Sequence, residues 1–102
     1  HPSVVEFLDV VMRQGELELR IEEIRIAAKS SMVGKTLADC RVRQETGVNV
    51  LAVRRFDGQL SLDQGADFTM KTGDTLISLG TDAQLAALAQ CAGDERHALR
   101  IR

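Results

Sequence analysis

The side chains best suited to bind a small anion are arginines, together with one asparagine in an apolar segment. Arg41 and Arg43 lie near the end of a predicted helical stretch, and Asn49 follows six residues after Arg43. A guanidinium presents a planar fork of N–H donors that suits phosphate, and the chain holds ten Arg against three Lys. Asn49 is costly inside the apolar run 48–53 unless its amide is hydrogen-bonded. It could cap the turn at Gly47, face a ligand, or face the same strand of a partner subunit.

The chain lacks the residue combinations that nucleophilic or metal-assisted catalysis needs. Its two histidines, His1 and His97, stand near the two ends, so neither is well placed beside a serine or cysteine nucleophile. No spacing typical of zinc or calcium sites occurs, and the eight glycines are scattered singly rather than gathered in a phosphate-binding loop. We therefore expect no catalytic residues, no metal ligands and no enzymatic activity.

Two pairs of adjacent charged residues have simple structural interpretations. Glu22–Glu23 would be solvated in a regular strand, where neighbours point to opposite faces and cannot share a proton or a cation. A bulge at that point would let them converge on a cation. Arg54–Arg55 end a predicted strand, where arginines normally extend into water.

The composition is that of one small globular domain. The 102 residues are 44% hydrophobic and 27% charged, with a net charge of −2 and a pI near 5.6. No apolar run approaches the length of a membrane span, and a nucleic-acid-binding surface normally needs a basic excess. Cys40 and Cys91 lie in apolar helical patterns, which indicates small buried residues in a reducing compartment. The sequence opens without Met in a helical pattern, and we interpret it as part of a longer protein.

An amphipathic helix is expected over residues 3–14, ending at Gly15. Its apolar arc is wider than one core contact needs, so it leaves hydrophobic surface for a partner. We expect this arc to form the interface of a symmetric homodimer. The residues that define the interface are Val4, Phe7, Leu8 and Val11.

The hydrophobic pattern of residues 17–27 changes phase in the middle of the segment. Apolar residues stand at odd positions up to Ile21 and at even positions from Ile24 onward, with Glu22–Glu23 between them. A one-residue change of phase moves side chains to the other face of a sheet. The pattern therefore predicts a bulge or break at the two glutamates, with both apolar sets buried.

The rest of the chain alternates short strands with two helical stretches. The helical stretches begin with capping signals and span residues 36–46 and 81–92. The predicted strands are 48–53, 60–62, 66–70 and 75–79. The first of these is apolar at nearly every position, which predicts a strand covered on both faces. Because the connections are too short for parallel crossovers, we expect an α+β fold in which helices cover a mostly antiparallel sheet.

Three blocks of the sequence resemble, in order and spacing, the regulatory C-terminal lobe that follows RCK/TrkA nucleotide-binding domains. Residues 31–37 (SMVGKTL) resemble its opening motif, 42–55 (VRQETGVNVLAVRR) its core, and 73–81 (GDTLISLGT) its closing motif. The segment 1–12 resembles the helix that links the two halves of such domains. One departure is Asp63–Gly65, near which many members carry a proline.

The resemblance implies a homodimeric cytoplasmic domain of a potassium channel or potassium-uptake protein, which passes a ligand-dependent rearrangement to a membrane pore. In members that bind cyclic di-adenosine monophosphate, an Arg and a polar residue hold this ligand at the dimer interface, and Arg43 and Asn49 match those positions. The implied organisation is a linker helix over 1–15, the regulatory lobe over 16–93 and a frayed tail over 94–102.

Two alternatives remain open for the function. The chain could be a ligand-free assembly module, or the same lobe in a different transporter or in a transcription regulator. The expected partners are a second copy of the chain and a membrane-embedded pore or transporter subunit, with no direct contact to nucleic acid.

Overall fold

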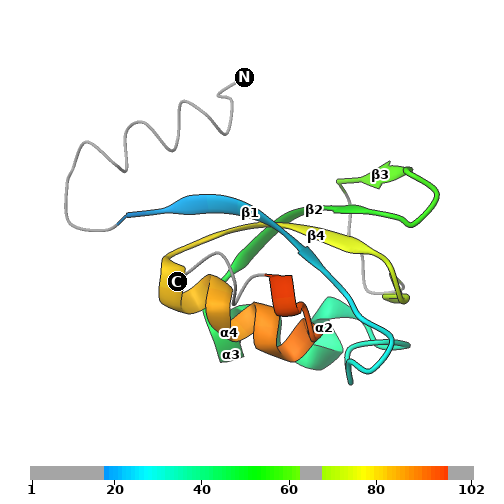
Figure 1. Cartoon of the computed structure of the whole chain (residues 1–102), viewed down its shortest axis with the longest axis horizontal. Helices are drawn as coiled ribbons and strands as arrows, with labels where there is room; N and C mark the ends of the chain where they lie inside the picture. The colour runs from blue at the N-terminus through cyan, green and yellow to red at the C-terminus, as the bar shows by residue number, and fades with distance from the viewer. Residues whose placement is uncertain (1–17, 63–67, 97–102) are drawn as a thin grey trace.

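The sheet at the centre of the fold is antiparallel and has four strands in the order β1–β4–β2–β3. The computed structural model describes residues 18–62 and 68–96. The strands, labelled as in Figure 1, are β1 (Arg20–Arg25), β2 (Asn49–Arg54), β3 (Leu60–Ser61) and β4 (Thr75–Gly80). This arrangement confirms the predicted α+β class with a mostly antiparallel sheet.

Three helices lie together on one face of the sheet (Figure 1). They are α2 (Leu37–Cys40), α3 (Val42–Thr46) and α4 (Asp82–Ala92). Helix α4 begins with the predicted capping box, in which the Thr81 hydroxyl accepts from the Gln84 N–H and the Gln84 side chain accepts from the Thr81 N–H. The fully buried core between α4 and the sheet contains Ile24, Val53, Leu76, Leu85 and Leu88. No helix among the described residues has the length and apolar character needed to cross a membrane.

Strand β1 is regular, and the predicted bulge at Glu22–Glu23 is wrong. Its register with β4 runs unbroken over Arg20–Arg25. Ile24 faces the helices and is fully buried, whereas Ile21 on the other face is 40% exposed. The apolar residues before and after the two glutamates therefore lie on opposite faces of one strand. Only the second set, which begins at Ile24, packs into the core.

A bulge occurs instead in β2, at Leu51. The register with β4 shifts between Val50 and Ala52. One extra residue reverses the phase of the strand, so Val50 and Val53, three positions apart, both pack against the core. This explains why residues 50–53 are apolar at consecutive positions. The expected cover on both faces is not observed, because no helix of the described part of the chain lies on the second face.

A buried ion pair joins the end of β2 to the start of β4. The Asp74 side chain is 1% exposed, and its Oδ2 accepts from Arg55 Nη1 at 2.6 Å and from the Lys71 N–H at 2.9 Å. Arg55 Nη1 also donates to the Thr69 carbonyl at 2.9 Å, and its guanidinium lies 3.8 Å from the centre of the Phe68 ring. The expectation that Arg55 extends into water is wrong, because the buried carboxylate needs a cation.

Asp94, the first residue of the expected tail, ties the end of α4 to β1. Its carboxylate is buried and accepts from the Arg25 N–H at 2.9 Å and from the Arg96 guanidinium at 3.1 Å. Burial by itself would raise the pKa of Asp94, but these hydrogen bonds hold the pKa below its ordinary value. Residues 97–102 lie outside the described part of the chain.

Arg55→Ala should lower the free energy of unfolding by about 3–5 kcal/mol, because it leaves the buried Asp74 carboxylate without its cation. Arg54 is the matched control, since it precedes Arg55 and pairs with Glu23, whose side chain is 54% exposed. Arg54→Ala should cost no more than about 1 kcal/mol. Urea unfolding followed by circular dichroism measures both values. Equal losses in the two variants would contradict the role assigned to the buried pair.

The lowered pKa of Asp94 predicts sensitivity to acid. A carboxyl group with a lower pKa in the folded state adds stability above its unfolded pKa, and this stability is lost as the pH falls through the folded value. The free energy of unfolding should therefore fall below about pH 4, and it should fall less steeply in Asp94→Asn. Urea titrations at a series of pH values measure the difference. Parallel pH profiles in the two proteins would show that Asp94 makes no such contribution.

Candidate functional site

Arg43 and Asn49, the two predicted ligand-binding residues, line one cavity of about 310 Å³. Arg43 lies in α3, Asn49 is the first residue of β2, and both are exposed. The other lining residues are mostly apolar and comprise Leu37, Ala38, Val42, Gln44, Val48 and Val50. Polar atoms make up more of the cavity surface than apolar atoms. A guanidinium and an amide there can bind a phosphate, with apolar side chains beside them for an adjoining ring.

The helical stretch predicted for residues 36–46 is divided in two at Arg41. This residue has φ 51° and ψ 45°, the left-handed conformation, which is unusual for a residue with a side chain. Helix α2 begins with the predicted capping box between Thr36 and Asp39, and α3 ends at Gly47, which has φ 81°. Residues from both short helices therefore reach the wall of the cavity.

Thr46, a residue with no predicted role, holds the turn between α3 and β2. Its hydroxyl donates to the Val42 carbonyl at 2.6 Å and accepts from the Val48 N–H at 3.2 Å. A hydroxyl residue next to a glycine turn is the sequence signal for such a contact. Asn49 does not cap this turn. In the described part of the chain, no hydrogen bond or ion pair engages the side chain of Asn49 or of Arg43, so both can meet a ligand.

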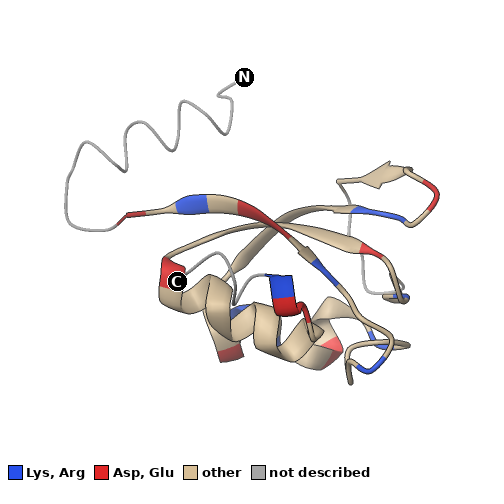
Figure 2. Ribbon diagram, viewed as in Figure 1, with Lys and Arg blue, Asp and Glu red and all other residues tan. Residues whose placement is uncertain are grey.

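The cavity carries an uncompensated positive charge. The acidic residue nearest in sequence, Glu45, lies 3.7 Å from Arg41 Nε. Arg43 has no carboxylate within ion-pair distance among the residues that the structure describes. Elsewhere the charges are mixed, as along β1, where basic and acidic residues alternate (Figure 2). A free guanidinium beside a cavity favours an anionic ligand.

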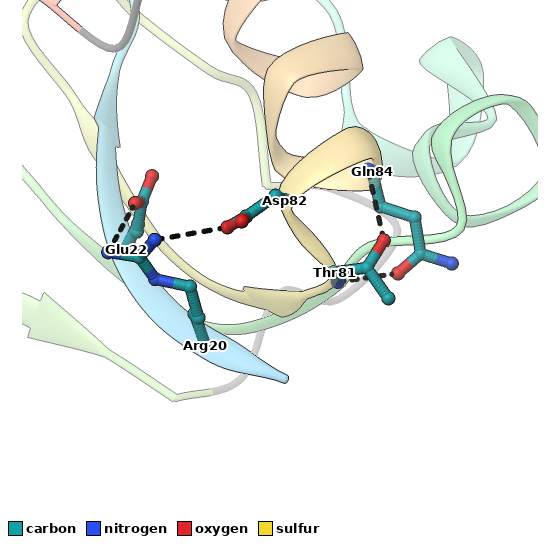
Figure 3. A network of polar contacts seen from close by, with 5 residues as sticks. All are labelled: Arg20, Glu22, Thr81, Asp82 and Gln84. Carbon is teal, nitrogen blue, oxygen red and sulfur yellow. Dashed lines mark hydrogen bonds and ion pairs between the residues drawn. The ribbon is translucent and has the colours of Figure 1, made fainter. Parts of the chain in front are cut away.

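Glu22 and Glu23 do not converge, so the alternative of a cation contact between them is wrong. Glu23 pairs with Arg54. Glu22 is buried on the face covered by the helices, 3.7 Å from the Arg20 guanidinium, which also donates to Asp82 at 3.1 Å (Figure 3). Within residues 18–62 and 68–96, no three potential metal ligands are grouped closely enough to hold an ion.

Several predicted features cannot be placed. The interface residues Val4, Phe7, Leu8 and Val11 lie outside the described residues. The same holds for the linker helix predicted over 1–15 and for the turn at Asp63–Gly65.

The TrkA-C domain model matches residues 21–91 of the chain. Among curated proteins, the chain is 31% identical over 87 residues to the K(+)/H(+) antiporter subunit KhtT of Bacillus subtilis, covering 85% of this chain and 50% of that protein. It is 25% identical over 91 residues to the probable potassium channel protein 2 of Methanocaldococcus jannaschii, covering 85% of this chain and 26% of that protein. The chain thus spans about a quarter to a half of the length of these relatives.

Two solved structures share the fold and contain c-di-AMP. One is the RCK C domain of the potassium transport protein KtrA, with a TM-score of 0.66 and 24% identity, covering 86% of this chain and 98% of that one. The other is the RCK_C domain dimer of S. agalactiae BusR, with a TM-score of 0.66 and 21% identity, covering 74% of this chain and 91% of that one. These similarities confirm the fold that the sequence motifs predict.

Arg41→Gly should stabilise the fold by about 0.5–1 kcal/mol, because glycine adopts the left-handed conformation without the steric cost of a side chain. Arg41→Ala is the matched control, since it removes the same exposed ion pair with Glu45 but keeps a Cβ atom. The alanine variant should not be stabilised. Urea or thermal unfolding measures both, and a glycine variant no more stable than the alanine variant would contradict strain at this junction.

Proposed function

Because the chain belongs to the TrkA-C domain family, we propose that it is a lobe that senses c-di-AMP and regulates a potassium channel or potassium transport protein. The family is one of regulatory domains rather than of enzymes. KhtT is named as a subunit of a K(+)/H(+) antiporter and the second relative as a probable potassium channel protein, and the chain covers half or less of each. The membrane pore or transporter, and a cytoplasmic position beside it, are therefore part of the proposal.

The observation that carries the ligand assignment is the cavity shared by Arg43 and Asn49. The Arg43 guanidinium would hold a phosphate through charge-assisted hydrogen bonds. The Asn49 amide both donates and accepts, so it would read the edge of an adjacent base. Val48 and Val50 of the same cavity would pack on the base ring. The c-di-AMP complexes of KtrA and BusR, which share this fold, support this choice of ligand.

A complete site requires two chains, so a symmetric homodimer is part of the proposal. A cyclic dinucleotide of this kind is two-fold symmetric and carries two phosphates, whereas one chain brings a single Arg43 to the cavity. A two-fold axis beside the cavity would supply the second arginine. The BusR domain is a dimer in its solved structure. The apolar arc of the 1–15 segment is the proposed contact, formed by Val4, Phe7, Leu8 and Val11.

Regulation requires that the ligand favour one arrangement of the dimer over another. Helix α2 has no fully buried residue, and it meets α3 at the left-handed Arg41, so α2 can shift relative to α3 at low cost. A ligand held by both Arg43 and Asn49 would fix α3 against the start of β2. A coupling free energy of about 1–3 kcal/mol between ligand and pore is typical of such systems.

A transcription regulator is the second candidate host. BusR in complex with promoter DNA has a TM-score of 0.66 to this chain, with 20% identity, covering 88% of this chain and 44% of that one. A net charge of −2 disfavours a direct DNA contact by the lobe itself, so another domain would bind DNA in such a host. A ligand-free assembly module is the remaining alternative, and a ligand titration separates it from both.

Isothermal titration calorimetry with c-di-AMP should show one ligand bound per two chains. Arg43→Ala should weaken binding about 10- to 100-fold, because a charged hydrogen bond to phosphate is lost. Asn49→Ala should weaken it about 5- to 10-fold. Lys29→Ala is the control, since this basic side chain pairs with Glu95 and does not line the cavity. It should bind as the unaltered chain does.

Two results would contradict the proposal. Absence of heat with c-di-AMP, or unchanged affinity in Arg43→Ala, would remove the ligand assignment and leave assembly as the function. Light scattering in the same buffer reports the number of chains per particle. A chain that stays monomeric with and without c-di-AMP would remove the dimer.

A further inference from the structure

A second cavity, of about 330 Å³, brings together the two cysteines of the chain. Cys40 is the last residue of α2, and Cys91 lies in the last turn of α4. Both are free thiols, and the predicted burial is not observed: Cys40 is half-buried and Cys91 is exposed. The other lining residues are both polar and apolar, and they comprise Ser31, Met32, Lys35, Asp39, Val42, Glu45, Thr46 and Leu88. A dissolved oxidant can reach thiols on such an accessible cavity and convert the two to a disulfide.

The elements that carry the two thiols differ in how firmly they are held. Helix α2 is a single turn without a fully buried residue, and it ends at the left-handed Arg41. Helix α4 is packed on the core, and the Cys91 carbonyl accepts the Ser30 hydroxyl at 2.7 Å. Helix α2, whose Leu37 and Cys40 are only partly buried against the core, is therefore the more easily displaced of the two elements.

We propose that Cys40 and Cys91 form a reversible oxidation site, at which a peroxide converts the two thiols to an intramolecular disulfide. The Cys91 sulfur attacks hydrogen peroxide, the O–O bond breaks, and a sulfenic acid and one water result. The Cys40 sulfur then attacks the sulfenic sulfur, and the hydroxyl group leaves with the thiol proton as a second water. The two thiols lose two electrons, and the peroxide gains them.

The order of these steps follows from the surroundings of the two thiols. Burial raises the pKa of the Cys40 thiol, although the Lys35 ammonium opposes this effect. A thiol that stays protonated is a poor nucleophile towards peroxide. The exposed Cys91 thiol is therefore the one that reacts with peroxide first, and Cys40 resolves the sulfenic acid.

Oxidation of the two thiols would also affect the cavity lined by Arg43 and Asn49. A disulfide holds its two Cα atoms about 4.4–6.8 Å apart, so its formation fixes the last residue of α2 against the last turn of α4. Leu37 and Ala38 belong to the same helical turn as Cys40, and they line the cavity of Arg43 and Asn49. The disulfide should therefore weaken ligand binding. This consequence rests on the proposed function, whereas the disulfide itself does not.

Peptide mapping of the whole chain tests the disulfide. After treatment with hydrogen peroxide and alkylation of remaining thiols, we expect a single chain about 2 Da lighter than the reduced form, with Cys40 linked to Cys91. Cys40→Ser should stop at a sulfenic acid on Cys91, which dimedone captures. Cys91→Ser should keep an unmodified Cys40 at the same dose. Retention of both thiols in the unaltered chain, or disulfides only between chains, would overturn the proposal.

Calorimetry with c-di-AMP on the reduced and oxidised chains tests the coupling. The oxidised chain should bind about fivefold more weakly or worse. Equal affinities would overturn the coupling. Absence of binding in both forms would overturn the proposed function and the coupling with it, while the peptide map still decides the disulfide.

Discussion

The carboxylate of Asp74 joins segments that are far apart in the sequence, and its burial constrains how they can be arranged. It accepts from Arg55 at the end of β2 and from the Lys71 N–H ahead of β4. Its backbone carbonyl accepts from the Ile26 N–H just after β1, and Arg55 extends the network to the Thr69 carbonyl. A buried carboxylate that loses its cation destabilises a fold by several kcal/mol. The ends of β1, β2 and β4 that meet at Asp74 therefore have few alternative arrangements.

Strand β2 runs from the ligand cavity to this ion pair. The bulge at Leu51 determines which face of the sheet the side chains at each end of the strand point to. Val53, near the Asp74 end, is fully buried against the helices. In a regular strand, residues at even spacing share a face, so Asn49 would point into the same core. The extra residue reverses the phase and places Val50 in the core instead. The amide of Asn49 is thereby left exposed and able to bind a ligand.

Features that depend on residues close in sequence were predictable. The capping boxes begun by Thr36 and Thr81 need only a residue three positions later. The sequence pattern also placed Arg43 in a helical stretch and Asn49 at the start of the strand that follows it. Features that depend on distant partners were not. The buried Glu22 carboxylate has a cation beside it, because the Arg20 guanidinium lies 3.7 Å away. The same guanidinium also pairs with Asp82 at the start of α4. Periodicity alone cannot reveal such a partner, nor which strand carries a bulge.

The packing of the lobe is uneven, and this indicates where a conformational change costs the least free energy. Strands β1 and β4 and helix α4 supply fully buried residues, whereas α2 supplies none. A ligand or an oxidant shifts an equilibrium only by the free energy with which it distinguishes two states. The weakly packed turn needs the least of this free energy, and the left-handed Arg41 beside it adds a conformational cost of about 1–2 kcal/mol to the present arrangement. Since both cavities include residues of α2, we expect this turn to respond to either event.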